Sequence, residues 1–308
     1  MDETIPAPSD DLEPTFRGSL TGVGDTPLAY ARWEVPDPRG RVVIAHGYGE
    51  HFGRYGHTAR WLNREGWSVS AMDHRGVGRS GGVRGDCRSI RGPVEDLTFF
   101  LRHERTQDGG RTGPEPLPQV LLGHSFGGLV AALVLLWHPD TLEALILSSP
   151  ALKLRKLPFG LKLLQKLCLW TMPHRPLDLP GDKSLVCSDP ALVRRYLEDP
   201  LCHRFISAGF LAAMEEGREE LLGFGAELDR PILLLDAGRD IVVDPDASEA
   251  LWSAVRPGLL QRHRLEGFYH EIFHDLDRDG AERLAGQWLD RLFPTGKGTL
   301  AMTPATHE

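Results

Sequence analysis

The chain has 308 residues, a formal charge of −8 at neutral pH and an ordinary hydrophobic content of 41%. This length suits one large domain or two small ones with a sizeable core, and the composition excludes a chain that is disordered as a whole. The negative charge disfavours nucleic acid as a partner, because phosphates require a basic surface. Four cysteines in a chain of this length are too few for a disulfide framework, and because they form no CxxC pair, neither a zinc knuckle nor a redox motif is predicted.

Neither end of the chain carries the pattern of a folded element. Residues 1–14 are acidic and proline-spaced, without the basic and apolar regions of a signal peptide, and residues 295–308 are small and polar. We expect residues 1–14 to be disordered and residues 295–308 to form a flexible tail. No run of 18 apolar residues occurs, so no transmembrane helix is predicted. A cytoplasmic protein with free thiols is the expectation.

Short apolar runs alternate with longer helical patterns along the chain. The apolar runs lie at residues 41–46, 67–73, 119–124, 144–149 and 231–236. Such runs are typical of strands that are buried on both faces of a parallel sheet. Crossover helices are expected at residues 54–65, 94–104 and 126–137. The sequence therefore predicts an α/β fold, with a mostly parallel central sheet flanked by helices.

The remaining elements extend this sheet and interrupt it once. We expect an antiparallel edge strand at residues 28–35, a last strand at 259–265 and a last helix at 280–292. The gap between the runs that end at residue 149 and begin at residue 231 is far longer than the dozen residues that a crossover needs. We therefore expect one core in two parts, with an inserted cap between them: residues 1–150, 151–230 and 231–308.

A candidate nucleophile lies in a G-x-S-x-G motif that runs from Gly123 to Gly127. Ser125 follows an apolar run and precedes an apolar helical stretch, which is the strand–turn–helix context of a nucleophile elbow. Flanking glycines are needed there because the serine occupies a sharp and strained turn. The alternative is a glycine-rich turn with an idle serine.

A serine hydroxyl needs a base to act as a nucleophile, and the base needs an orienting carboxylate. Asp240 follows the run at residues 231–236, and His270 follows the predicted last strand. Both therefore come at the carboxyl ends of strands, where open α/β sheets have their sites. In this fold class the triad residues follow along the chain in the order serine, acid, histidine. The rival acids are Asp236, expected within the strand, and Asp244, expected in the next turn.

The loop after residues 41–45 is a candidate oxyanion loop. Gly47 and Gly49 let the backbone bend and approach a substrate oxygen closely, and His46 begins the loop. An oxyanion hole takes one backbone N–H from the residue after the nucleophile and one from such a loop. We assign the N–H groups of Phe126 and Tyr48 to these positions. The alternative is that the loop is only a turn.

Together these motifs resemble the monoacylglycerol lipase and lysophospholipase group of the α/β-hydrolase family. The resemblance spans about residues 26–292 and is carried by residues 46–55, 73–80 and 123–128, by Asp240, and by Tyr269 with His270. It implies a Ser–His–Asp hydrolase of monoacyl esters with a cap over the site and no cofactor. One departure is the bulky Tyr48, because this group often has a small residue there. This departure narrows the expected acyl or alcohol pocket.

Residues 270–274 also match H-E-x-x-H, the pattern of zinc peptidases. The longer form of that pattern requires glycine at position 277 and histidine at position 280, where this chain has Asp277 and Gly280. The match also coincides with the histidine that a hydrolase needs, so the hydrolase is favoured. Four further histidines cluster near the glycine-rich loops, and we expect them to bond to these loops and to hold no metal: His46, His51, His57 and His74.

Residues 151–175 carry six basic residues and no acidic one. Two lysines, Lys162 and Lys166, lie away from an apolar helical face made by Leu157, Leu161, Leu164 and Cys168. A basic amphipathic helix can lie on an anionic membrane or contact a lipid substrate. The alternative is a cap helix that packs on the core. We predict that this segment lines an acyl-binding channel and leave peripheral membrane contact open.

Several other functions fit the same motifs. A lysophospholipase or a short-chain carboxylesterase would use the same residues on another ester. An α/β-fold peptidase or a cofactor-free haloperoxidase can use the same triad. A non-catalytic binding module could share the fold, although the three triad candidates and the glycine loop argue against it. The sequence predicts a small lipid or ester substrate and does not predict the oligomeric state.

Overall fold

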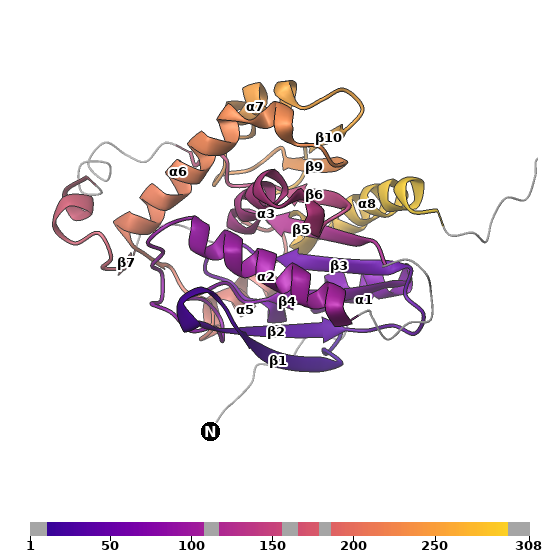
Figure 1. Cartoon of the computed structure of the whole chain (residues 1–308), viewed down its shortest axis with the longest axis horizontal. Coiled ribbons are helices and arrows are strands. Elements are labelled where there is room, and N and C mark those ends of the chain that lie inside the picture. The colour runs from indigo at the N-terminus through magenta and orange to yellow at the C-terminus, as the bar shows by residue number, and fades with distance from the viewer. Residues whose placement is uncertain (1–10, 108–116, 156–165, 179–185, 295–308) are drawn as a thin grey trace, which may run out of the picture.

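The computed structural model describes residues 11–107, 117–155, 166–178 and 186–294. Within these residues, the chain folds around one eight-stranded sheet with helices on both faces (Figure 1). In spatial order the strands are β1 (Phe16–Thr21), β2 (Pro27–Trp33), β4 (Trp67–Met72), β3 (Gly40–Ala45), β5 (Gln119–His124), β6 (Ala144–Ser148), β9 (Ile232–Ala237) and β10 (Leu260–Leu265). Neighbouring strands from β4 to β10 are parallel. The predicted α/β fold is confirmed.

Helices cover both faces of the sheet and account for its continuous apolar strands. One face is covered by α1 (Gly56–Arg64) and α8 (Arg278–Leu292), and the other by α2 (Arg91–Gln107), α3 (Phe126–Trp137), α6 (Ala208–Gly223) and α7 (Glu249–Ala254). In β5, Leu121 packs into the core of one face, while Val120 and Leu122 pack into the core of the other. A strand that feeds two cores has no polar face, which is why β5 has an unbroken apolar run.

The predicted edge strand is β2, but it does not lie at the edge. It is antiparallel to both of its neighbours, and β1 pairs on its outer side in a register that runs from Phe16 opposite Arg32 to Thr21 opposite Pro27. No residue of β1 is fully buried, so this strand has no apolar run that a search for buried strands could detect.

The prediction of disorder at the amino end is wrong for residues 11–14. The N–H of Leu12 donates to the carbonyl of Gly56 at 3.2 Å, and the carbonyl of Leu12 accepts the indole N–H of Trp33 at 2.7 Å. The Asp11 carboxylate lies between His57 and Arg195, at 3.4 and 3.0 Å, and its side chain is 8% exposed. The backbone of Leu12 and the carboxylate of Asp11 thus bond to α1, and the same carboxylate also bonds to Arg195 in the inserted segment. Residues 1–10 and 295–308 lie outside the described residues.

The segment between β6 and β9, where a cap is predicted, contains helices and a small sheet. The paired strands are β7 (Leu177–Asp178) and β8 (Phe205–Ile206), and the longer helices are α5 (Pro190–Glu198) and α6. Not all of the segment stands apart from the core, because Phe210 and Met214 of α6 belong to the core around α3. Among the described helices, none is long and apolar enough to cross a membrane.

The basic part of this segment is described only in part. Residues 166–171 form a short helix that projects at the left of Figure 1, away from the sheet. In this helix Cys168 is buried. The predicted apolar face at Leu157, Leu161 and Leu164 lies outside the described residues.

Short 3-10 turns occupy several of the connections. They are η1 (Val23–Asp25), η2 (Phe52–Tyr55), η4 (Pro139–Thr141), η6 (Gly225–Glu227), η7 (Pro245–Ser248) and η8 (Ile272–His274). Two of them matter for the site, since η2 follows the oxyanion loop and η8 follows His270.

Candidate active site

Ser125 occupies the sharp turn between β5 and α3, at the carboxyl edge of the sheet. Its φ is +52° with ψ at −117°, a conformation that costs free energy for a residue with a side chain. The glycines of the motif make room for the turn. A Cβ at Gly123 would lie 2.7 Å from the Ala131 side chain, and one at Gly127 would lie 2.1 Å from the Ala45 carbonyl. The motif therefore lets α3 begin directly against the end of β3.

His270 and Asp240 complete a chain of hydrogen bonds from Ser125. His270 Nε2 lies 2.9 Å from Ser125 Oγ, and His270 Nδ1 lies 2.7 Å from Asp240 Oδ2. The other carboxylate oxygen of Asp240 accepts the N–H groups of Val242 and Val243, each at 2.8 Å. Because an ionised carboxylate can only accept, Nδ1 carries the proton and Nε2 accepts the serine hydroxyl. The structure thus brings the three sequence-predicted residues together in a nucleophile–base–acid arrangement.

The surroundings of Asp240 keep it ionised. Burial by itself raises its pKa, but the His270 ring and the two backbone N–H groups lower the pKa below its usual value overall. The rival Asp236 lies within β9, where its carboxylate is 2.6 Å from Arg262 Nε. The second rival, Asp244, immediately precedes η7. Neither rival is bonded to His270.

The predicted oxyanion loop follows β3 and approaches the start of α3. Phe126 is the first residue of that helix, so its N–H has no acceptor within the helix. His46 is buried and fixes the loop: its Nε2 accepts the N–H of His74 at 3.0 Å, and its Nδ1–H donates to the carbonyl of Gly47 at 2.8 Å. Gly49 has a φ of +72°, which favours glycine.

A buried cluster of charges behind this loop was not predicted from the sequence. Arg54 forms ion pairs with Glu50 and Glu271, and Glu50 Oε1 accepts the N–H of Gly47 at 2.6 Å. Burial raises the pKa of Glu50, but Arg54 and the nearby histidines lower it well below the usual value overall. The available signal was a pair of opposite charges four residues apart in a loop otherwise rich in glycine and aromatic residues.

The H-E-x-x-H residues do not have the geometry of a zinc peptidase. The last three of these residues form the single 3-10 turn η8. In a zinc peptidase, the two histidines of the motif bind the metal from successive turns of an α-helix. Both ring nitrogens of His270 are engaged, and Nε2 of the buried His274 bonds the carbonyl of Arg54 at 3.1 Å. Glu271 precedes η8 without capping it through its side chain, and it pairs with Arg54.

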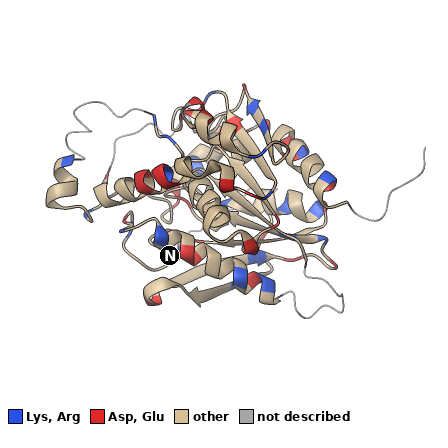
Figure 2. Ribbon diagram, turned by 45° about the horizontal axis from the view of Figure 1, so that its top comes forward, with Lys and Arg blue, Asp and Glu red and all other residues tan. Residues whose placement is uncertain are grey.

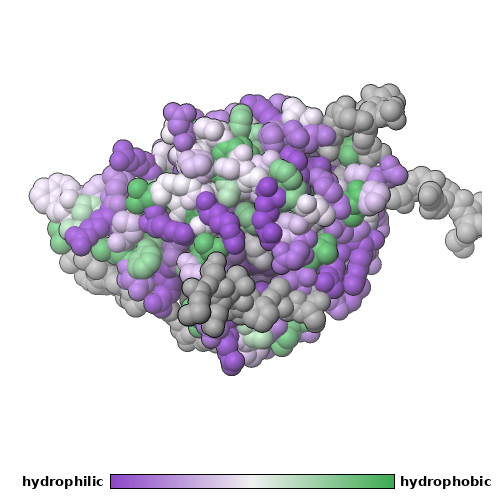
Figure 3. All heavy atoms as spheres, turned by 90° about the horizontal axis from the view of Figure 1, so that it is seen from below, coloured by the Kyte–Doolittle hydropathy of each residue, from purple (hydrophilic) through white to green (hydrophobic). Residues whose placement is uncertain are grey.

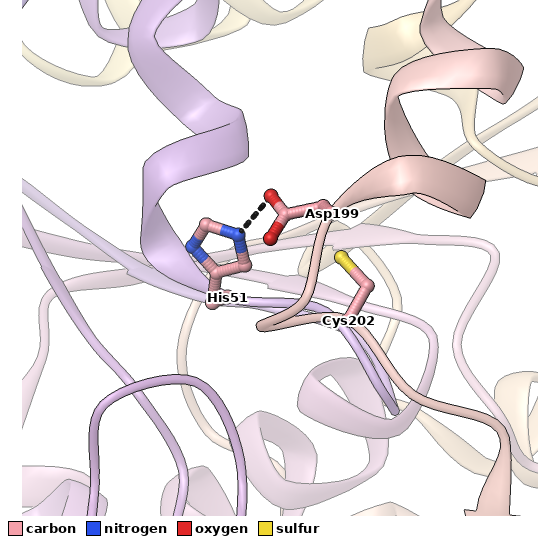
Figure 4. A group of neighbouring side chains, drawn as sticks. All are labelled: His51, Asp199 and Cys202. Carbon is pink, nitrogen blue, oxygen red and sulfur yellow. Dashed lines mark hydrogen bonds and ion pairs between the residues drawn. The ribbon is translucent and has the colours of Figure 1, made fainter. Parts of the chain in front are cut away.

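The cluster of His51, Asp199 and Cys202 brings three metal-ligating atoms within 4.8 Å of one another in the described part of the chain (Figure 4). His51 Nδ1 accepts the N–H of Gly53 at 3.1 Å, so the ring proton is on Nε2, which donates to Asp199 at 2.8 Å. A metal bound at Nε2 would force a proton onto Nδ1, facing that N–H. Burial also raises the pKa of the Cys202 thiol, which opposes the thiolate form. The arrangement therefore favours a hydrogen-bonded pair over a metal centre.

A family model described as "Serine aminopeptidase, S33" matches residues 36–277. The chain belongs to this family of hydrolases. The predicted family resemblance is thereby confirmed, and the match includes Ser125, Asp240 and His270.

Named relatives of this hydrolase act on lipids. It is 35% identical over 274 residues to a monoacylglycerol lipase of Mycolicibacterium smegmatis, covering 83% of this chain and 90% of that one. It is 28% identical to phospholipase YtpA of Bacillus subtilis, covering 84% and 98% of the two chains. A solved structure of the Paleococcus ferrophilus monoacylglycerol lipase matches with a TM-score of 0.73 and 32% identity, over 85% of this chain and 98% of that one.

Proposed function

We propose that this hydrolase cleaves the ester of a monoacylglycerol through an acyl-enzyme on Ser125. His270 Nε2 takes the hydroxyl proton as Ser125 Oγ attacks the carbonyl carbon, and then gives the proton to the leaving glycerol oxygen. Asp240 keeps the other ring proton on Nδ1 and stabilises the imidazolium. Water, deprotonated by His270, then attacks the acyl-enzyme and releases the fatty acid. The reaction needs no cofactor.

The oxyanion of each tetrahedral intermediate is bound by the N–H groups of Tyr48 and Phe126 in this proposal. His46, Gly47 and Gly49 hold the loop that carries the first donor. The N–H of Phe126 is also the first of α3, whose aligned peptide dipoles favour a negative charge at this end.

The observation that carries the proposal is the continuous hydrogen-bond chain from Ser125 through His270 to Asp240, with the ring proton fixed on the far nitrogen. The test replaces Ser125 by alanine. Ser125→Ala should abolish hydrolysis of monoacylglycerols and labelling by a fluorophosphonate, with an unchanged thermal unfolding curve. Turnover that persists in this variant would contradict the scheme.

The substrate class is tested with a panel of esters. Monoacylglycerols, lysophospholipids and p-nitrophenyl esters of graded acyl length, together with peptide anilides, should give the highest kcat/KM for a monoacylglycerol. A phospholipase is the second candidate, since one relative bears that name. A preference for peptide anilides would show that the hydrolase is a peptidase instead. Loss of activity after treatment with a chelator would support the zinc peptidase hypothesis.

The projecting segment supports a second part of the proposal, contact with an anionic lipid surface. Four apolar side chains are exposed on it or beside it: Leu167, Leu169, Trp170 and Met172, with Trp170 exposed by 84%. In Figure 3 the left-hand end of the molecule shows hydrophobic and weakly polar residues beside purple ones. The segment 151–175 is basic, whereas the neighbouring α6 carries grouped acids (Figure 2). Apolar side chains on a basic support suit an anionic membrane.

Vesicle binding tests this surface. Trp170→Ser, and reversal of charge at Lys162 and Lys166, should each reduce sedimentation with vesicles that contain anionic lipid. Phe224→Ser is the matched control, because Phe224 is 45% exposed at the opposite end of α6, about 22 Å along that helix. Unchanged binding by the first two variants, or equal loss in the control, would remove this part of the proposal.

A further inference from the structure

The oxyanion loop and the residue that follows it are bonded to the inserted segment at three residues: Tyr48, Gly49 and His51. We call residues 199–205 of that segment the clamp. The N–H of His203 donates to the carbonyl of Gly49 at 2.9 Å, and the hydroxyl of Tyr48 donates to the carbonyl of Phe205. At the end of the loop, where η2 begins, the ring of His51 donates to Asp199 (Figure 4). The loop and the clamp are therefore joined by both backbone and side-chain bonds.

The contact between the clamp and the loop is also sterically tight. A Cβ at Gly49 would lie 2.2 Å from the carbonyl oxygen of His203, so only glycine fits beside the clamp. The ring of Tyr48 meets the His203 ring edge-on at 5.4 Å and the Phe210 ring at 4.7 Å. Such close packing leaves no room for one side to move without the other.

Asp199 is itself held in place. Its second carboxylate oxygen accepts the N–H of Leu201 at 2.8 Å, and its pKa is lowered overall, because the bonds and charge of His51 outweigh the effect of burial. On the partner side, Gly53 fixes the ring of His51 through Nδ1. The His51–Asp199 bond thus joins two pre-oriented groups, which lowers the entropy lost in forming it.

These bonds bear on the peptide that carries the Tyr48 N–H. From the core side, the Gly47 N–H is held by Glu50. From the other side, the clamp bonds to the hydroxyl of Tyr48 and to the carbonyl of Gly49, the two residues that follow that peptide bond in the chain. A shift of the clamp must therefore turn or displace the peptide between Gly47 and Tyr48.

We infer that the clamp is part of the oxyanion machinery, with Asp199 and His51 as positioning residues for the Tyr48 N–H. The inference rests on the proposed function, since it takes that N–H as an oxyanion donor. Movement of the inserted segment then controls the rate of the chemical step and not only access to the site. The sequence predicts that Tyr48 narrows the substrate pocket. In this inference its side chain has a second role, because its hydroxyl bonds to the clamp.

The test compares two acidic residues of the inserted segment. Asp199→Ala removes the acceptor for His51, whereas Asp199→Asn keeps an acceptor oxygen. Glu215→Ala is the control, because Glu215 accepts from Arg218 Nε at 2.9 Å within α6, is about half exposed, and has no contact with the loop or the clamp among its described bonds. All variants are assayed on a short p-nitrophenyl ester and checked by thermal unfolding.

Asp199→Ala should lower kcat about tenfold or more, because a small misplacement of a catalytic group costs up to about a hundredfold, while KM changes little. Affinity for a trifluoromethyl ketone, whose adduct needs the oxyanion hole, should fall by the same factor as kcat. Asp199→Asn should recover most of both. A purely structural role would not make the two losses parallel.

The two failures are distinguishable. If the wild-type chain hydrolyses no ester, or Ser125→Ala does, the proposed function fails. If the wild-type chain is active and Asp199→Ala resembles Glu215→Ala in kcat and in ketone affinity, only the clamp inference is overturned. Tyr48→Phe gives an independent check: its loss should not add to that of Asp199→Ala, because both act on one loop.

Discussion

Glu271, the residue after His270, forms an ion pair of 2.6 Å with Arg54, which also pairs with Glu50 in the oxyanion loop. Arg54 thus joins the two loops that supply the candidate base and one candidate oxyanion donor. The guanidinium also lies 5.0 Å from the centre of the Tyr196 ring on α5. One buried cation therefore contacts three separate parts of the site.

Replacing Arg54 tests how much the fold depends on this cation. Arg54→Met leaves Glu50 and Glu271 buried without their positive partner, so the free energy of unfolding should fall by about 3–5 kcal/mol, as measured in urea. Arg102→Met is the control, because the Arg102–Asp140 pair is 3.6 Å long and more than half exposed. The control should lose under about 1 kcal/mol. Equal small losses in both variants would show that the buried pair is not structural.

The same cluster predicts a preference for uncharged head groups. Glu50, Glu271 and Asp240 supply three carboxylates near the nucleophile, and the cations bonded to these residues are Arg54 and Arg155. Burial lowers the pKa of the nearby His124 to about 4 and keeps it neutral, so the negative charge remains in excess. An anionic substrate is therefore repelled. At equal acyl length, kcat/KM for a monoacylglycerol should exceed that for a lysophosphatidic acid by about tenfold or more.

Glu271→Gln tests whether this charge is the cause, because it removes one of the three carboxylates without changing the size of the side chain. The ratio of the two kcat/KM values should narrow in this variant. Added salt should narrow the ratio in the wild type as well. A ratio near one in the wild type, or one that Glu271→Gln leaves unchanged, would refute the electrostatic account.

Much of the site could be predicted because its residues are tied to local patterns. Ser125, Asp240 and His270 each follow a recognisable strand, and the parallel order of those strands brings their carboxyl ends to one edge of the sheet. The α/β fold followed from the same apolar runs. These predictions needed no knowledge of distant contacts.

The remaining features depend on pairs that are far apart in the chain. Arg54 and Glu271 are separated by 217 positions, and His51 and Asp199 by 148. The sequence around one partner of each pair does not predict which distant residue it will contact. The strand β1 was missed for another reason: it pairs at the rim of the sheet, where only one side of the strand is covered and no apolar run is required.

Buried histidines predict how stability depends on pH. Burial lowers the pKa of His74 and His274 well below the usual value, and that of His124 to about 4. An unfolded histidine binds a proton near pH 6.5, so below that pH the unfolded state holds more protons than the folded state. The free energy of unfolding should therefore fall as the pH is lowered from 6.5 towards 4.

His124→Gln should reduce this loss by up to about 2 kcal/mol between pH 7 and pH 5, since one group that protonates on unfolding is gone. Urea unfolding at each pH provides the measurement. Ser125→Ala changes the adjacent residue without removing a histidine, and it should keep the wild-type slope. An unaltered slope in His124→Gln would mean that this ring is already charged in the folded state.

Gly127 sets the distance between the nucleophile elbow and the oxyanion loop. A Cβ there would lie 2.1 Å from the carbonyl of Ala45 and 2.4 Å from that of His46, both backbone atoms at the end of β3. Gly127→Ala must push α3 away from that strand, so it should cost about 1–3 kcal/mol of stability and lower kcat more than KM rises. Gly223→Ala is the matched control, since a Cβ at this helical glycine meets nothing within 4 Å. Unfolding curves and esterase kinetics should distinguish the two variants. A Gly127→Ala enzyme with wild-type kcat would show that this close contact does not set the geometry of the oxyanion donors.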